Sequence, residues 1–202
     1  FNEFFTRELR PGVRPASPDP AELCCPADCR LLVHPRLPEG RCVPVKGRSF
    51  TVADLLGPRG KAAAERFAGG ALAVCRLCPA DYHRYHYPAE GTTLDAWEID
   101  GRLHSVNPLA LALNLPVFDQ NHRFVSLLAL ARFGEVAFVE VGAFGVGKIV
   151  QTHRGAAFSR LEEKGLFRFG GSTVVLVFRP GTVVFAEDLV ASSARGVETV
   201  VH

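Results

Sequence analysis

Three short segments of this sequence carry side chains suited to acid–base or nucleophilic chemistry. Asp28 lies in the segment Cys25-Pro-Ala-Asp-Cys29, and two histidines stand at positions 83 and 86. Ser172 follows two glycines near the carboxyl end. A carboxylate, an imidazole and a hydroxyl can form a relay, because the carboxylate orients the ring and the ring takes the hydroxyl proton. The residue pattern alone does not show that the three side chains meet.

Ser172 stands between Gly170-Gly171 and the apolar run Thr173–Phe178. One interpretation is a hairpin with a glycine pair in its turn, which the pattern alone favours. The other is a self-processing bond between Gly171 and Ser172. Glycine lacks a Cβ, so its carbonyl is open to attack by the neighbouring hydroxyl, and the resulting ester would allow β-elimination.

The two histidines belong to a polar and aromatic stretch, Asp81–Pro88. On a strand, His83 and His86 would point to opposite faces, whereas on a helical turn they would share one. Structural, acid–base and metal-binding roles are all compatible with the pair. Because no third ligand stands at a familiar spacing, we predict no metal there.

Six cysteines could suggest a zinc site, at positions 24, 25, 29, 42, 75 and 78. Zinc ligands usually come as repeated pairs separated by two to four residues. Cys24 and Cys25 are adjacent, and the Cys75–Cys78 pair is not repeated, so the spacing fits zinc poorly. We interpret the cysteines as small buried apolar residues and predict no metal site. The sequence does not decide whether any of them form disulfides.

The composition is that of a globular protein, with 202 residues, 48% hydrophobic and 22% charged. The net charge of +2 gives no support for bulk binding to nucleic acid. No apolar run approaches the roughly 18 residues of a membrane-spanning helix. Without repeats or linkers, one domain over 1–202 is expected. The chain begins at Phe1 and has no methionine, so we expect a piece of a longer precursor.

Short apolar segments separated by glycine indicate strands through most of the chain. We predict strands over 29–33, 41–45, 71–77, 92–99, 124–132, 135–141, 146–153, 166–169 and 173–178, with a turn at Asp100-Gly101. Short helices are expected within 1–10, 52–56, 61–67 and 186–201. The prediction is a mainly β (α+β) fold, a compact single-domain β-barrel or sandwich with a few short helices at the N-terminus, in the middle and at the C-terminus.

Taken in order, these segments resemble the phosphatidylserine decarboxylase family. The resemblance rests on Phe4–Pro15, Pro26-Ala27-Asp28, Val45–Thr51, Asp81–Pro88, Leu103–Pro108 and Phe169–Thr173, which together cover essentially the whole chain. Cys29 stands where the family usually has glycine, which leaves the Asp28 side chain unaffected. The tail Asp188–Thr199 is more similar to the eukaryotic endomembrane branch than to the mitochondrial one.

The resemblance implies a proenzyme that cuts itself between Gly171 and Ser172 into a large (β) chain 1–171 and a small (α) chain 172–202. By this analogy Asp28, His86 and Ser172 form the processing triad. Ser172 becomes a covalent pyruvoyl group, which serves as the electron sink that pyridoxal phosphate provides elsewhere. His83 is the expected acid or base of the decarboxylation step.

The resemblance further implies that phosphatidylserine is the substrate and that phosphatidylethanolamine and carbon dioxide are the products. The enzyme would be peripheral on a membrane, with an endomembrane compartment favoured by the tail. Phe1, Phe4 and Phe5 suit either membrane docking or ordinary packing. The large and small chains of one precursor are expected partners, a homodimer is left open, and nucleic acid is not a partner.

Three other functions stay open. The first is a non-catalytic β-barrel carrier or scaffold module, although the chain has no methionine and no lysine in a convincing hairpin tip. The second is a pyruvoyl decarboxylase of a soluble amino acid, a kind of enzyme expected to cut itself much nearer the amino end, so a cut close to the carboxyl end favours the lipid enzyme. The third is a Ser-His-Asp hydrolase, which would need the Gly-x-Ser-x-Gly motif that Ser172 lacks.

Overall fold

Strands dominate the structure, a computed structural model that describes residues 2–38, 41–42, 50–107, 113, 115–143, 148–168 and 172–202. The strands are β1 Cys29–His34, β2 Arg41–Cys42, β3 Phe50–Thr51, β4 Ala71–Leu77, β5 Arg84–His86, β6 Gly91–Ile99, β7 Arg123–Leu130, β8 Gly134–Gly142, β9 Lys148–Gln151, β10 Ala157–Phe158, β11 Glu163–Arg168, β12 Ser172–Phe178 and β13 Thr199–Val201. The helices are α1 Asn2–Phe5, α2 Val52–Ala64, the 3-10 turn η1 Glu65–Phe67, α4 Val117–Gln120 and α5 Glu187–Ala194. The predicted mainly β class is confirmed.

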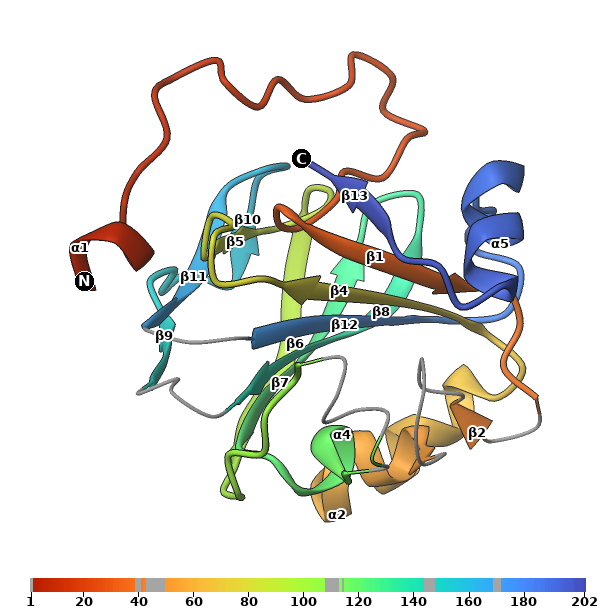
Figure 1. Cartoon of the computed structure of the whole chain (residues 1–202). Helices are drawn as coiled ribbons and strands as arrows, with labels where there is room; N and C mark the ends of the chain where they lie inside the picture. Colours follow the sequence, from red (N-terminus) through yellow and green to blue (C-terminus); the bar gives the residue numbers. More distant parts are fainter. Residues whose placement is uncertain are drawn as a thin grey trace.

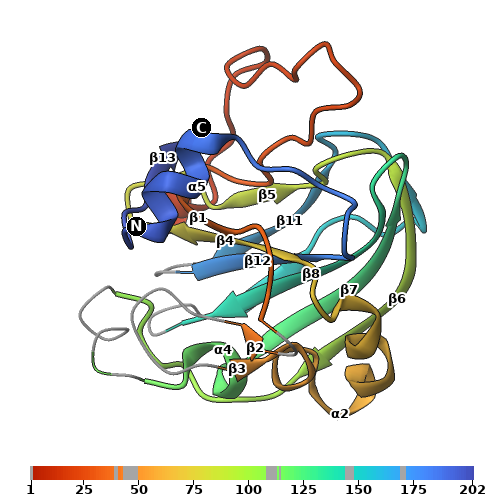
Figure 2. The ribbon, with the colours of Figure 1, turned by 90° about the vertical axis from the view of Figure 1, so that its right-hand side faces the viewer.

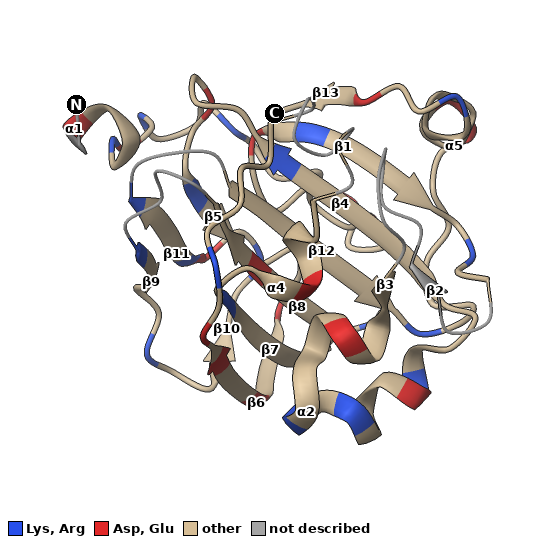
Figure 3. Ribbon diagram, turned by 60° about the horizontal axis from the view of Figure 1, so that its bottom comes forward, with Lys and Arg blue, Asp and Glu red and all other residues tan. Residues whose placement is uncertain are grey.

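Eight strands form one antiparallel sheet in the order β10-β6-β7-β8-β12-β4-β1-β13 (Figure 1). Strand β12 lies near its centre, and all seven of its residues are buried. A strand covered on both faces is expected to read as an unbroken apolar run, as Thr173–Phe178 does. Figure 3 shows β12 without a charged residue, whereas charges mark α2 and the outer strands. A single hydrophobic core runs from β1 to β12.

A second sheet, in the order β5-β11-β9, lies beside the end of β12 and β4 in Figure 1. Strand β11 pairs with β5 and β9, while β12 pairs with β4 and β8. The hairpin interpretation of the glycine pair is therefore wrong, because the strands before and after it belong to different sheets. Residues 169–171 connect the two sheets and lie outside the described residues.

The secondary structure of the C-terminal tail differs from the prediction. A helix was expected over 186–201, but α5 ends at Ala194 and β13 pairs antiparallel with β1, with Val201 opposite Cys29. Gly196 adopts a positive φ of 69° shortly after the helix, a conformation that glycine allows at low cost. The tail therefore completes one edge of the large sheet.

Three further predictions, in the first half of the chain, differ from the structure or lie partly outside the described residues. The two short helices expected over 52–56 and 61–67 are α2, kinked at Gly57 with φ of 68°, followed by η1. The Asp100-Gly101 turn does not connect paired strands directly, because β6 pairs with β7, which begins only at Arg123. Of the strand predicted over 41–45, β2 contains the first two residues, and the rest lies outside the described part of the chain.

A buried ion pair joins the two sheets. The Nζ atom of Lys164, on β11, lies 2.5 Å from Oε1 of Glu140, on β8, and neither side chain is more than 2% exposed. Gln151, on β9, accepts a hydrogen bond from Lys164 and donates one to Glu140. Burial lowers the pKa of Lys164 and raises that of Glu140, while the attraction between the two charges opposes both shifts.

We expect Lys164→Met to lower the free energy of unfolding by about 3 to 5 kcal/mol, because it leaves the buried Glu140 carboxylate without its cationic partner. The double variant Glu140→Leu/Lys164→Met should recover most of the loss. Urea unfolding can be followed by the fluorescence of Trp97, the single tryptophan, which is 7% exposed. A Lys164→Met protein as stable as the unaltered chain would show that the pair contributes little.

Candidate functional site

The two histidines are placed by the connection from β4 to β5. Leu77, the last residue of β4, lies opposite Ser172 at the start of β12. The chain then turns through residues 78–82 and enters β5, where His86 lies opposite Glu163 of β11. Just before β5, the carbonyl of His83 accepts a hydrogen bond from the Phe167 amide at 2.9 Å. His83 is therefore near the end of β11 that leads toward Ser172, and His86 is farther along.

His83 is completely buried. Its Nδ1 atom lies 2.8 Å from the carbonyl oxygen of Asp81, and since a carbonyl can only accept, Nδ1 carries the proton. Nε2 is then the basic nitrogen of the neutral ring. The ring of Phe5, from α1, packs edge-on against His83 with centroids 4.8 Å apart. Phe5 is thus a packing residue, whereas Phe4 is 49% exposed.

His86 faces a cavity of about 390 Å³. Its ring stacks on Tyr82, with centroids 5.9 Å apart, and its amide donates to the Pro26 carbonyl at 2.8 Å. That bond ties β5 to the segment that carries Asp28. Burial lowers the pKa of His86, partly offset by the charge of Glu163. A neutral imidazole at neutral pH can accept a proton.

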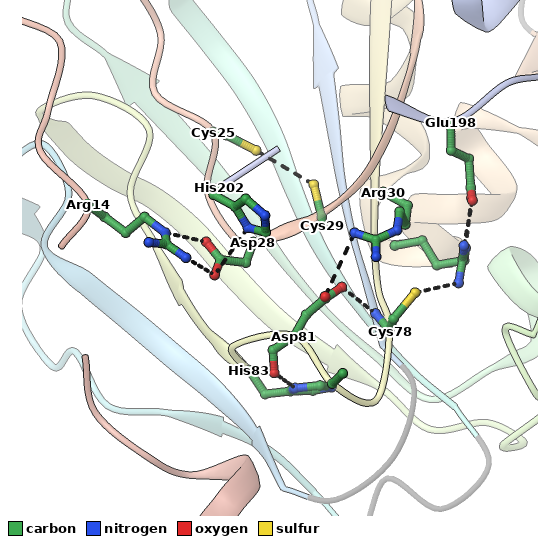
Figure 4. Close-up of polar contacts among 12 residues, drawn as sticks. Arg14, Cys25, Asp28, Cys29, Arg30, Cys78, Asp81, His83, Glu198 and His202 are labelled. Carbon is green, nitrogen blue, oxygen red and sulfur yellow. Dashed lines mark hydrogen bonds and ion pairs between the residues drawn. The ribbon is translucent and has the colours of Figure 1, made fainter. Parts of the chain in front are cut away.

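Asp28 lines the same cavity, but its carboxylate is held by Arg14. The guanidinium donates from Nε to Oδ1 at 2.9 Å and from Nη2 to Oδ2 at 2.8 Å. Nδ1 of His202, near the end of β13, lies 3.6 Å from Oδ2 (Figure 4). Figure 2 shows the N-terminal arm looping over the end of the molecule where the chain terminates. This arm brings Arg14 to Asp28.

Ser172 is completely buried between Leu77 of β4 and Gly142 of β8. Its Oγ atom has no hydrogen-bond partner among the residues that the structure describes. A buried hydroxyl without a partner destabilises a fold, so such a group calls for an explanation beyond stability. Gly171, on the other side of the predicted cleavage bond, lies outside the described residues.

The predicted triad is therefore only partly assembled. Asp28 and His86 share the cavity, and Ser172 is not among the described residues that line it. Within the described chain, no hydrogen bond joins any two of the three side chains. His83 and His86 point into different surroundings, as expected for residues three apart at a strand.

Two residues of the cavity were missed by the sequence interpretation. Arg14 lies inside the Phe4–Pro15 motif, and that position was the only feature of the sequence that could have indicated a role for it at the site. His202 carried no signal, because only the pairing of β13 with β1 brings it to Asp28. Within the part of the chain that the structure covers, no helix is long and apolar enough to cross a membrane.

The structure thus defines a mainly β protein with a completely buried serine at the start of a central strand. Comparisons with known proteins add its family. The model of the family described as phosphatidylserine decarboxylase matches residues 1–198. The chain therefore belongs to the phosphatidylserine decarboxylase family.

Individual relatives carry the same family name. The phosphatidylserine decarboxylase proenzyme of Chlamydia trachomatis is 42% identical over 200 residues, and that of Chlamydia muridarum is 43% identical over 201. Each match covers 98% of this chain and 66% of the relative. Phosphatidylserine decarboxylase proenzyme 3 of Schizosaccharomyces pombe is 42% identical over 204 residues, 100% of this chain and 21% of the relative. The chain thus spans just under two thirds of the chlamydial proteins and about a fifth of the yeast one.

Proposed function

We propose that this chain is the catalytic part of a self-processing decarboxylase that converts phosphatidylserine to phosphatidylethanolamine and carbon dioxide. The observation that carries the proposal is the Oγ atom of Ser172, buried and without a partner in the described structure. It stands directly after two glycines in a chain that matches the family over residues 1–198. A serine kept there at a cost to stability is suited to react with its own backbone.

Processing begins with attack of the Ser172 hydroxyl on the Gly171 carbonyl. The new C–O bond replaces the C–N bond, and His86 moves the hydroxyl proton to the freed nitrogen. Asp28 stabilises the cationic ring during that transfer. Loss of the Ser172 Cα proton then expels the Gly171 carboxylate. Water replaces the nitrogen, which leaves as ammonia, and the new chain begins with a ketone.

This assignment of the triad requires a rearrangement. His86 has to approach Ser172 from its place in the cavity, and Arg14 has to release one oxygen of Asp28. Support comes from the shared cavity and from the bond between the His86 amide and the Pro26 carbonyl, which couples the two segments.

The pyruvoyl group formed from Ser172 supplies a ketone that binds the substrate amine and accepts the electron pair left by carbon dioxide. We assign protonation of the substrate carbon to His83. The hydrogen bond from Nδ1 to the Asp81 carbonyl orients the ring, so that Nε2 can take up a proton that the substrate ammonium group loses and deliver it to the substrate carbon. Its full burial under Phe5 excludes water from that proton.

We further propose that the large chain 1–171 and the small chain 172–202 stay paired after the cut. Strand β12, the first seven residues of the small chain, is hydrogen-bonded to β4 on one side and β8 on the other. Strand β13 adds pairing with β1. Separating the chains would expose a fully buried strand, which is strongly unfavourable.

Peripheral contact with a membrane is supported by α1. Phe4 is 49% exposed, and the Arg7 guanidinium lies 4.2 Å from the centre of its ring. An exposed aromatic ring beside a cation suits an interface with anionic lipid headgroups.

Intact mass spectrometry of the purified protein tests the function directly. We expect two chains that separate under denaturing conditions, the smaller beginning with a pyruvoyl group in place of Ser172. Release of carbon dioxide from phosphatidylserine should accompany them. One uncut chain without this activity would favour the carrier or scaffold alternative and overturn the proposal.

The rate of self-cleavage should depend on pH through His86. Because burial lowers its pKa below the ordinary value of about 6.5, the ring is already neutral at pH 7 and its basic form persists into mildly acidic solution. We therefore expect the cleavage rate to be level around neutral pH and to fall only below about pH 6.5. Time courses of freshly translated precursor measure this, with circular dichroism to check folding at each pH. A rate that keeps rising well above neutral pH would exclude His86 as the base.

A further inference from the structure

Three thiols form a cluster next to the segment that carries Asp28. The sulfur atoms of Cys25, Cys29 and Cys75 all lie within 4.8 Å of one another. The Cys25 and Cys29 sulfurs are 3.7 Å apart (Figure 4). Cys29 and Cys75 are fully buried, and Cys25 is half-buried on the wall of the cavity.

The strand register explains why the sequence hid this cluster. Cys75 of β4 lies opposite Leu31 of β1, so Cys29, two residues from Leu31, is on the same face and diagonal to Cys75. Cys25 joins them from the loop before β1. The three ligands therefore come from a loop and two neighbouring strands, and not from paired Cys-x-x-Cys motifs, on which the sequence prediction of no metal site relied.

Two further cysteines, Cys24 and Cys78, are engaged elsewhere. The Nε atom of Arg160 donates to the Cys24 sulfur at 3.1 Å, and Nη1 of Arg76 donates to the Cys78 sulfur at 3.2 Å. Neither belongs to the group of three. The neighbours Cys24 and Cys78 are thus natural controls for the cluster.

We propose that Cys25, Cys29 and Cys75 form a binding site for one thiophilic d10 cation, Zn²⁺, with its fourth coordination position open to the cavity. Zinc–sulfur bonds of about 2.3 Å in a tetrahedron require sulfurs about 3.8 Å apart, close to the Cys25–Cys29 separation. The remaining sulfur–sulfur distances are all within 4.8 Å and so exceed this separation by at most about 1 Å. Three protein ligands and an open position facing solvent are a known zinc arrangement.

The electrostatics of the cluster favour loss of a proton from Cys25. Hydrogen bonds from the Cys29 and Cys75 thiols lower the pKa of the Cys25 thiol well below its usual range. Binding of Zn²⁺ displaces thiol protons to solvent, so affinity should rise with pH.

The ion would tie the loop before β1 to the sheet. Asp28 stands between Cys25 and Cys29, so a metal held by both fixes the backbone on either side of this carboxylate. The expected consequence is a higher unfolding temperature in the presence of zinc, since the native protein binds it more tightly than the unfolded chain.

The test uses the full chain, purified under reducing conditions and stripped with a chelator. Titration with Zn²⁺ against a chromophoric chelator should give one equivalent bound, and Co²⁺ should give the visible bands of a tetrahedral thiolate site. Cys25→Ser, Cys29→Ser and Cys75→Ser should each weaken Zn²⁺ binding by at least about 100-fold. Cys24→Ser and Cys78→Ser should bind as the unaltered protein does.

Cys25→Ser is the decisive variant, because its half-buried site should tolerate serine even if the two buried positions do not. Circular dichroism establishes that each variant is folded. Absence of Zn²⁺ binding in the reduced protein would overturn the site. So would full binding by Cys25→Ser, or binding lost in Cys24→Ser or Cys78→Ser. None of these readouts requires decarboxylase activity. The zinc site is therefore tested independently of the proposed function.

Discussion

A Ser172→Ala chain is expected to remain uncut and to have no decarboxylase activity. The hydroxyl is the proposed nucleophile in processing, and its oxygen is the atom that leaves with the Gly171 carboxylate in the elimination that forms the pyruvoyl group. Its removal therefore abolishes both the cut and the decarboxylation. Complete loss is expected because the bond that must break joins Gly171 to residue 172, and only the side chain of residue 172 can supply the hydroxyl that replaces its nitrogen.

The variant should fold at least as well as the unaltered precursor. The Oγ atom has no hydrogen-bond partner among the described residues, so alanine leaves no donor or acceptor unsatisfied. Inactivity of this variant would therefore show that the hydroxyl is needed for the reaction, and would not be a result of misfolding. Denaturing gels, intact mass and carbon dioxide release from phosphatidylserine measure the outcome.

Thr173 offers a matched control. Its Oγ1 atom is also buried and without a partner within the described structure, one residue farther along β12. Thr173→Val removes that hydroxyl while keeping the shape, and we expect it to be cut and active. An uncut Ser172→Ala chain with full activity would refute the pyruvoyl mechanism, and an uncut Thr173→Val chain would shift the nucleophile away from Ser172.

Substitutions of the two histidines should cause different defects. His86→Ala is expected to block self-cleavage, with a rate reduced by about 10²- to 10⁴-fold through loss of the general base. His83 should not be needed for the cut. Replacing it should give two chains whose turnover falls by about 10²- to 10⁴-fold, since the substrate carbon then lacks its acid.

The substitution at position 83 has to preserve the fold, because His83 is fully buried and Nδ1 donates to the Asp81 carbonyl. His83→Asn keeps a donor near Nδ1 and removes the Nε2 group to which we assign the proton. The cut fraction from gels and the turnover of the cut fraction are measured separately. If both variants stop at the same step, the division of roles is wrong.

The position of His83 gives this comparison its value. Its carbonyl is bonded to Phe167, close to the segment that connects β11 with Ser172, whereas His86 faces the cavity of Asp28. An uncut His83→Asn chain beside a cut His86→Ala chain would reverse the two assignments. It would also make the rearrangement of Arg14 and Asp28 unnecessary.

Much of the fold follows from local pattern. The apolar runs at 71–77 and 173–178 are β4 and nearly all of β12, because strands buried on both faces need continuous apolar residues. Strands β3, β5, β10 and β13 were not predicted. Each has only two or three residues, too few for a periodic signal, and exists because a neighbouring strand supplies its hydrogen bonds.

The sequence by itself determined the mainly β class, the family and the chemically competent residue types, since these depend on residue order and near neighbours. Only the tertiary structure decided that β11 and β12 lie in different sheets, that Arg14 holds Asp28, and that three distant cysteines meet. Such contacts depend on which strands pair and in what register. Register is set by burial summed over the whole sheet, and no single segment encodes it.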